Sequence, residues 1–242
     1  MLRGLRPGLS RLTADGLFGV WQWAYRTGTA GPDSRHARRF KAVGAGTGFA
    51  FPPGASFGER WIQLGQANLV GPGVVMAAGM WPDEPLDPPT GWVIRIGDRC
   101  NLGRDCSFIG RIGIDIGDDV TFGPGVYVTD HNHDYAHPRV PISDQWVIEA
   151  PVRIGSGCWF GVGSVVLPGA TVGRHVAVAA GSVVRGDIPD RCVVAGSPAR
   201  VVRQWDEARG QWDPPLPEGR GIAGENAPPG WITEPPALRC HR

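Results

Sequence analysis

The stretch IGSGCWFGVGSVVLPGATVGRHVAVAAGSVV, residues 154–184, decides the fold because its apolar residues recur every six positions. Glycine often follows the apolar residue directly, and the fourth residue after it is small or β-branched. An α-helix repeats every 3.6 residues and a simple strand every two, so neither produces this pattern. The large apolar residues that carry the period are Ile154, Phe160, Val166, Val172, Val178 and Val184.

A hexad of this kind is typical of a short strand, a bend and another short strand. The apolar residue and the small residue are expected to point inward, and the glycine is expected where the backbone needs unusual dihedral angles. Three such hexads close a triangular coil, and stacked coils bury one continuous column. The sequence therefore predicts an all-β fold, a parallel β-solenoid built of hexapeptide repeats.

The same period extends toward the N-terminus and fixes the expected boundaries. It runs through Ile96, Leu102, Phe108 and Ile114, slips by two residues and resumes at Ile116. We expect a β-helix domain over residues 46–203, interrupted by a proline-rich loop at 79–91 and a polar segment at 129–150. Residues 1–45 form a basic, helical lead-in in this interpretation, and residues 204–242 form an extended, Pro-rich tail without apolar period.

Composition limits the classes of partner. Hydrophobic residues make up 42% of the 242, enough for a core, and the net charge of +1 predicts neither nucleic-acid binding nor attraction of the whole chain to a membrane. Residues 1–41 are the exception, with eight Arg and Lys against two Asp. We expect this segment to be solvated, with weak peripheral contact to phosphates or anionic lipid as the alternative.

Nothing in the sequence predicts an integral membrane contact or a secreted protein. The segment from Leu17 to Tyr25 is too short for the roughly 18 apolar residues of a spanning helix, and no leader with a small-residue cleavage site is recognisable. We therefore expect a cytoplasmic protein. The odd number of cysteines and the lack of a CxxC pair agree with this, and three of them occupy the inward small slot, where packing is favoured over metal binding. The five are Cys100, Cys106, Cys158, Cys192 and Cys240.

Histidine is the residue type that points to chemistry. His131, His133 and His137 lie in one excursion from the repeats, and histidine is the side chain most easily poised as a base near neutral pH. The sequence has no nucleophile elbow, no P-loop and no HExxH motif, and Ser164 and Ser182 occupy inward slots. A lone general base acting on a bound hydroxyl or amine is the simplest interpretation.

Two segments, VTDHNHDYAHP at 128–138 and the repeats at 154–203, resemble the hexapeptide-repeat acyltransferases, the group that contains maltose, galactoside and other sugar O-acetyltransferases. The resemblance covers residues 92–203 well and 46–78 weakly. It implies a left-handed β-helix, an exception to the usual right-handed crossover, and a homotrimer with sites between neighbouring subunits. It also implies transfer of an acetyl or other acyl group from a coenzyme A thioester to a hydroxyl of a sugar or related small acceptor, with acyl-CoA as co-substrate and no metal.

On the acceptor side of the site, the resemblance assigns His131, and the other candidates rest on their residue type and position. His131 matches the histidine that deprotonates the acceptor. His133 is expected to contact the acceptor or to order the loop, and His137 to order the loop. Asp105 and Asp130 are candidates for binding sugar hydroxyls.

The donor side rests on matches in the later repeats. Trp159 and Gly161 match the turn that lines the donor channel, and Ala180 and Arg185 match positions beside the pantetheine arm. Arg203 matches a basic position near the nucleotide phosphates. The chain departs from the family where Arg185-Gly186 replaces the usual Thr-Lys before Asp-Ile-Pro, so that arginine would have to take the place of the lysine.

Two other functions stay open from the sequence. One is a zinc enzyme resembling the γ-type carbonic anhydrases, with His131, His133 and His137 around the metal, although those enzymes spread their ligands along the coils and across a subunit boundary. The other is a non-catalytic trimeric scaffold that assembles partners through its basic N-terminus.

Overall fold

The structure, a computed structural model, describes residues 7–214, with side chains from residue 13 onward. The chain divides into two compact units, Met1–Val202 and Arg203–Arg242, and each is described by itself. Cys240 and most of the predicted Pro-rich tail, residues 215–242, lie outside the described residues.

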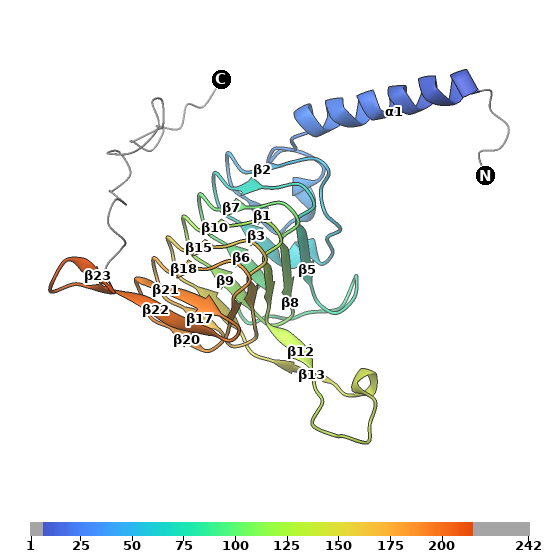
Figure 1. Ribbon diagram of the computed structural model, residues 1–242. Helices are drawn as coiled ribbons and strands as arrows, with labels where there is room; N and C mark the ends of the chain where they lie inside the picture. The colour runs from blue at the N-terminus through green and yellow to red at the C-terminus, as the bar shows by residue number, and fades with distance from the viewer. Residues whose placement is uncertain (1–6, 215–242) are drawn as a thin grey trace. The chain divides into compact units, whose positions relative to one another are not determined.

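The first unit is a parallel β-helix of the predicted left-handed type, whose coils follow one another along the chain (Figure 1). Each coil between the first and the last contributes one short strand to each of three parallel sheets, which are named here by their first strands. The β1 sheet contains β1 (Ala42–Val43), β3 (Ile62–Leu64), β6 (Ile94–Ile96), β9 (Ile114–Ile116), β14 (Val152–Ile154), β17 (Thr171–Val172) and β20 (Asp187–Ile188). In this unit the β2 sheet contains β2 (Gly48–Phe49), β4 (Leu69–Val70), β7 (Asn101–Leu102), β10 (Thr121–Phe122), β15 (Trp159–Phe160), β18 (Ala177–Val178) and β21 (Cys192–Gly196). The β5 sheet contains β5 (Val75–Ala78), β8 (Ser107–Gly110), β11 (Tyr127–Thr129), β16 (Val165–Val166) and β19 (Val183–Val184).

Pairing between coils keeps equivalent hexad positions in register. Phe122 of β10 pairs with Leu102 on one side and Phe160 on the other, and the same register recurs in every sheet. The rings of Phe122 and Phe160 stack at 4.9 Å, and Phe108 meets Phe122 edge-on at 5.1 Å. Each buried phenylalanine contributes about 1.5–3 kcal/mol of apolar burial. All apolar and small residues predicted to point inward are buried, so the hexad interpretation is confirmed.

The predicted reason for the glycine after each apolar residue is wrong. Positive φ angles occur two positions later in the hexad, at residues such as Asp105 (φ 59°) and Gly125 (φ 67°). The directly following glycines are needed because neighbouring coils approach closely. A Cβ on Gly155 would lie 2.6 Å from the carbonyl oxygen of Gly173 in the next coil, a separation that real Cβ atoms do not show.

The cysteines of the described chain serve the core, as predicted. Cys100, Cys106, Cys158 and Cys192 are free and buried. The Cys106 thiol donates to the carbonyl oxygen of Gly123 in the next coil at 3.1 Å, and Cys158 does the same to Gly173 at 3.1 Å. Burial raises the pKa of the Cys100, Cys106 and Cys158 thiols to about 11, so they are protonated and unreactive at neutral pH.

Other elements lie outside the coils. The lead-in contains the helix α1 (Pro7–Thr27) and the short turn η1 (Ala37–Arg39), and the first coil begins at β1, slightly before the expected boundary at 46. A second turn, η2 (Glu59–Trp61), precedes β3. Residues 79–91 loop out without strands, as predicted. The polar segment 129–150 is an antiparallel hairpin of β12 (His131–His133) and β13 (Val147–Glu149), with η3 (Ile142–Asp144) between them.

The second unit differs from the expected extended tail in its first residues. Strand β22 (Ala199–Asp206), which begins just before this unit, pairs antiparallel with β23 (Gln211–Asp213) through residues 204–206. The rings of Trp205 and Trp212 meet edge-on at 5.6 Å in this hairpin. Because the backbone N–H and C=O groups of these two strands pair with each other, the segment can fold without the hexad period.

Candidate functional site

The predicted base, His131, lies at the first residue of β12, where the chain leaves the β5 sheet. Its Nδ1 atom lies 2.9 Å from Oδ1 of Asp130, and its side chain is 13% exposed. Because an ionised carboxylate only accepts hydrogen bonds, Nδ1 carries the proton in this pair. The lone pair of Nε2 is then left for a proton from elsewhere, as a general base requires.

Asp130 is fixed by the turn of the preceding coil. Its carboxylate accepts the backbone N–H groups of Arg111 (2.9 Å), Ile112 (2.8 Å) and Gly113 (2.7 Å), and Asp130 is completely buried. Three N–H donors offset the cost of burying this negative charge. The prediction that Asp130 binds sugar hydroxyls is therefore corrected, because its oxygens are enclosed and already accept four bonds.

The niche for Asp130 comes from the two-residue slip of the hexad period. The extra residues between Phe108 and Ile116 form the turn at 111–113, whose N–H groups point at one carboxylate instead of continuing a ladder. The slip can be seen in the sequence, but the sequence does not show that the extra residues form a turn that binds the Asp130 carboxylate.

A second cluster, which the sequence analysis missed, holds the hairpin that carries His131. The Arg111 guanidinium forms an ion pair with Glu149, the residue directly opposite His131 in the β12–β13 pair, and lies 3.3 Å from Glu84. It also lies over the ring of Trp146, 5.1 Å from the centroid. Arg111 thus ties the Asp130 turn, the 79–91 loop and the hairpin together through one side chain.

The other two histidines of the excursion do not join His131 around a common point. His133 and His137 are exposed. The side-chain amide of Gln145 accepts the backbone N–H of His137 and donates to its carbonyl oxygen. Among the residues that the structure describes, no three His, Cys, Asp or Glu side chains form a group that could hold a metal ion.

The predicted donor residues lie mainly at a different corner of the coil. A Cβ on Gly161 would lie 2.5 Å from the backbone nitrogen of Ala180, so these two residues stack in neighbouring coils. They follow the β2 sheet, and Trp159, half exposed, lies on the outer face of that sheet in β15. We call this turn region, between the β2 and β5 sheets, the Gly161 corner. Asp105 is exposed and lies at the Gly161 corner. Within one chain it is therefore not at the corner that carries His131.

Arg185 lies instead at the corner of His131. It follows β19, which is two strands from β11 in the β5 sheet, so the separation along the coil axis is about 10 Å. This region, between the β5 and β1 sheets, is called the His131 corner. Gly125 at the Gly161 corner precedes His131 by six residues, so the two corners of one chain lie up to about 20 Å apart. Arg203, half-buried in β22, belongs to the second unit.

This protein combines stacked hexapeptide coils with a carboxylate-paired histidine at one corner. Two family descriptions match it: "Hexapeptide repeat of succinyl-transferase" over residues 93–130 and "Bacterial transferase hexapeptide (six repeats)" over residues 151–186. These matches confirm the resemblance to the hexapeptide-repeat acyltransferases that the sequence indicated.

Particular relatives agree with the class. A probable acetyltransferase of Mycobacterium tuberculosis is 39% identical over 122 residues, which are 49% of this chain and 41% of the relative. WbbJ of Escherichia coli, named as a lipopolysaccharide biosynthesis O-acetyl transferase, is 36% identical over 107 residues, 41% of this chain and 55% of WbbJ. The chain thus spans about half the length of these curated relatives.

Solved structures share the fold. A variant of AntD, an N-acyltransferase from Bacillus cereus crystallised with dTDP and coenzyme A, aligns with a TM-score of 0.58 at 17% identity, over 73% of this chain and 91% of AntD. Within residues 7–214, no helix combines the length and the apolarity needed to cross a membrane.

Proposed function

We propose that this protein is an acyltransferase that moves an acetyl or other acyl group from a coenzyme A thioester to a hydroxyl of a sugar or a related small acceptor. The observation that carries the proposal is the buried Asp130–His131 pair, which leaves one imidazole nitrogen as a base at the edge of a hexapeptide fold. The O-acetyl transferase name of WbbJ supports a hydroxyl acceptor, and the coenzyme A bound to AntD supports the donor.

The chemistry needs only one side chain that moves a proton. Nε2 of His131 takes the proton of the acceptor hydroxyl as its oxygen attacks the thioester carbonyl. The tetrahedral intermediate then expels the thiolate, which takes the same proton from the imidazolium. Asp130 stabilises the imidazolium while it carries the proton, and a base held in this way contributes about 10²–10⁴-fold to the rate.

We also propose a homotrimer, and the outer face of the β5 sheet supports it. Side chains that alternate with the buried column point outward there, and in this sheet most of them are apolar, with Ser107 as the polar member of the row that contains Tyr127. The corresponding outward residues of the β1 sheet are polar, which favours the β5 sheet as the face for a second copy. The apolar outward residues are Val75, Ile109, Tyr127, Val165 and Val183, whereas the β1 sheet presents Gln63, Arg95, Asp115, Arg153 and Asp187.

This packing supplies what one chain lacks. If three chains turn their β5 sheets toward a threefold axis, the His131 corner of each chain meets the Gly161 corner of the next. Acceptor activation by His131 would then face the donor channel of Trp159, Gly161 and Ala180 from a neighbour, and Arg185 would lie beside the pantetheine arm at the same junction. Arg203 would bind the nucleotide phosphates, and Asp105 would reach the acceptor from the neighbouring chain.

The alternatives have less support. The zinc enzyme would gather His131, His133 and His137 around one ion, and in the described chain these three side chains do not form a metal-holding group. A scaffold without activity gives no reason for a buried carboxylate aimed at a half-enclosed histidine. The free thiols of the described cysteines favour a reducing compartment, so we propose that the reaction takes place in the cytoplasm.

The test compares two histidines in one hairpin. Release of the coenzyme A thiol from acetyl-CoA is followed with a panel of hexoses and hexosamines. We expect His131→Ala to lower turnover about 10²–10⁴-fold with coenzyme A affinity unchanged by calorimetry. His133→Ala, an exposed neighbour in the same strand, serves as the control and should change turnover much less. Equal turnover of His131→Ala and wild type would contradict the proposal, and the reverse ranking would move the base to His133.

A further inference from the structure

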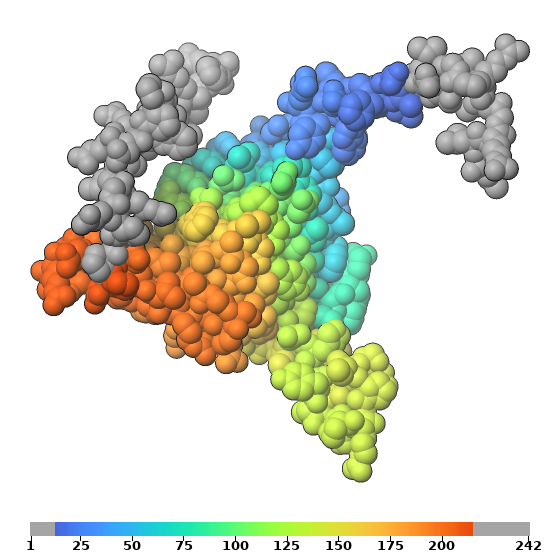
Figure 2. Space-filling model, in the orientation of Figure 1, coloured from blue at the N-terminus to red at the C-terminus, as the bar shows by residue number. Residues whose placement is uncertain are grey.

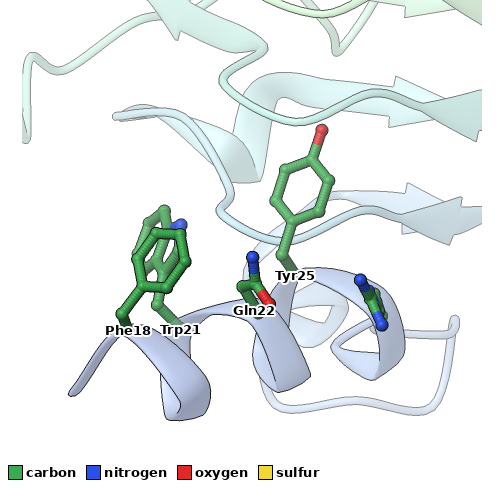
Figure 3. Close-up of a pocket in the computed structure, with 5 residues that line it drawn as sticks. Phe18, Trp21, Gln22 and Tyr25 are labelled. Atoms are coloured by element: carbon green, nitrogen blue, oxygen red, sulfur yellow. The ribbon is translucent and has the colours of Figure 1, made fainter. Parts of the chain in front are cut away.

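The helix α1 exposes an unusual amount of apolar surface. Leu17 is 72% exposed, Trp23 67% and Phe18 62%, whereas large residues of this kind are normally buried. Figure 3 shows Phe18, Trp21 and Tyr25 projecting from one side of the helix, with the polar Gln22 beside them at the edge of this side. On this apolar side, Trp21 meets Phe51 edge-on, with 5.2 Å between the ring centroids. A surface of this size on a soluble domain marks an interaction site.

The exposed residues are ordered around the helix. At 100° per residue, Leu17, Val20, Trp21 and Ala24 fall on one side, and Trp23, Tyr25 and Phe18 extend it to more than half of the circumference. The remaining arc carries Asp15, Gln22 and Arg26. α1 is therefore an amphipathic helix whose apolar side lacks a core to pack against.

The sequence segment that contains this helix is positively charged. Residues 1–41 carry eight Arg and Lys against two Asp, although the whole chain is close to neutral. Between α1 and the first coil, Arg35, Arg38 and Lys41 are exposed. The partner of α1 should therefore be apolar at depth and negative at its surface.

We propose that α1 docks on an anionic lipid surface and holds the protein against a membrane. Tryptophan and tyrosine prefer the boundary between head groups and acyl chains, and each Lys or Arg near an anionic surface contributes about 1 kcal/mol. A second copy of the chain fits less well, because the β5 sheet already provides an apolar face for copies and a like-charged segment would repel itself. This inference goes beyond the proposed acyl transfer and does not depend on it.

A trimer would strengthen this docking. A threefold axis parallel to the coils places all three α1 helices at the N-terminal end of the assembly, because each leads into the first coil of its own chain. Three weak anchors on one end bind far more tightly than one, since the second and third bind intramolecularly. An acceptor attached to a lipid would then be brought to the site.

The experiment is flotation of the full chain with vesicles of phosphatidylcholine, with or without 30% phosphatidylglycerol. We expect a partition coefficient at least about tenfold higher on the anionic vesicles, and a several-fold loss in 0.5 M NaCl. The double variant Leu17→Glu/Trp23→Glu should lower it at least about tenfold. Leu69→Glu, an exposed residue of the β2 sheet, is the matched control and should bind like wild type.

Three results would overturn the proposal. The first is no flotation of the wild-type chain with anionic vesicles. The second is full flotation of the double variant, and the third is equal loss in the Leu69→Glu control. Light scattering without vesicles tests whether α1 instead binds a second copy of the chain. A particle mass that falls only in the double variant would show that it does. Circular dichroism of the double variant checks that the β-helix is still folded. We expect this, because α1 precedes the first coil and contributes no strand to it.

Discussion

Replacing Asp130 by asparagine separates the fold of the site from its chemistry. The amide oxygen can take the position of Oδ2 and keep the N–H bonds of Ile112 and Gly113. The NH₂ group then faces Nδ1 of His131, which must accept instead of donate. The imidazole proton moves to Nε2, and the base is lost although every side chain stays in place.

The magnitudes distinguish this change from simple unfolding. The corresponding exchange in a catalytic triad lowers turnover about 10⁴-fold, and we expect a loss of about 10³–10⁴-fold here, or about 4–5.5 kcal/mol in the barrier. The free energy of unfolding should fall by only about 1–3 kcal/mol, because most hydrogen bonds remain but lose their charge assistance. Asp130→Ala leaves three N–H groups without acceptor and should cost about 3–6 kcal/mol.

Turnover is measured by thiol release from acetyl-CoA, and stability by urea unfolding of the same preparations. Asp130→Asn with more than a tenth of the wild-type turnover would refute the tautomer argument. A loss of stability as large as that of Asp130→Ala would show that the carboxylate is needed for the turn itself.

Three further outcomes follow from the coils. Val165→Asp on the outer face of the β5 sheet should convert the proposed trimer to monomers in light scattering, whereas an unchanged mass would place the interface elsewhere. Gly155→Ala should lower the free energy of unfolding by about 2–3 kcal/mol, because its Cβ would clash with the backbone of the next coil. Gly125→Ala, at positive φ with open space around it, should lower it by about 1–2 kcal/mol. Equal losses in urea unfolding would contradict the close approach of neighbouring coils at Gly155. The pKa of the Cys100, Cys106 and Cys158 thiols is about 11 in the folded protein, against 9.0 for a thiol in water. The stabilisation is therefore complete below pH 9 and is lost as the pH rises toward 11, by about 1–3 kcal/mol per thiol. Unfolding midpoints that stay constant from pH 8.5 to 11 would contradict the burial of the thiols Cys100, Cys106 and Cys158.

The core could be predicted from the sequence because one period controls it. Phe108, Phe122 and Phe160 were placed inward by counting in sixes, and they form the aromatic column of the structure. The role of the following glycines could not be found in this way, because close approach depends on the next coil and not on the local backbone. Likewise, the β22–β23 hairpin uses local antiparallel pairing, which leaves no hexad signal.

The candidate site was predicted in part. His131 stood out by residue type and position in an excursion, but a sequence shows neither burial nor partners. Asp130 therefore looked like a sugar ligand, although the turn at 111–113 encloses it. Arg111 gave no signal at all, because its partners Glu84 and Glu149 are 27 and 38 residues away.

The most direct test of the account is complementation between two inactive chains. His131→Ala removes the base, and Ala180→Trp fills the Gly161 corner; each alone should be inactive. Co-expressed in equal amounts, they form trimers in which a site combines an intact His131 corner with an intact Gly161 corner with a probability of about one in four. The account predicts about a quarter of the wild-type turnover in the mixed protein. Turnover no higher than that of the two separate variants would contradict a site shared between chains.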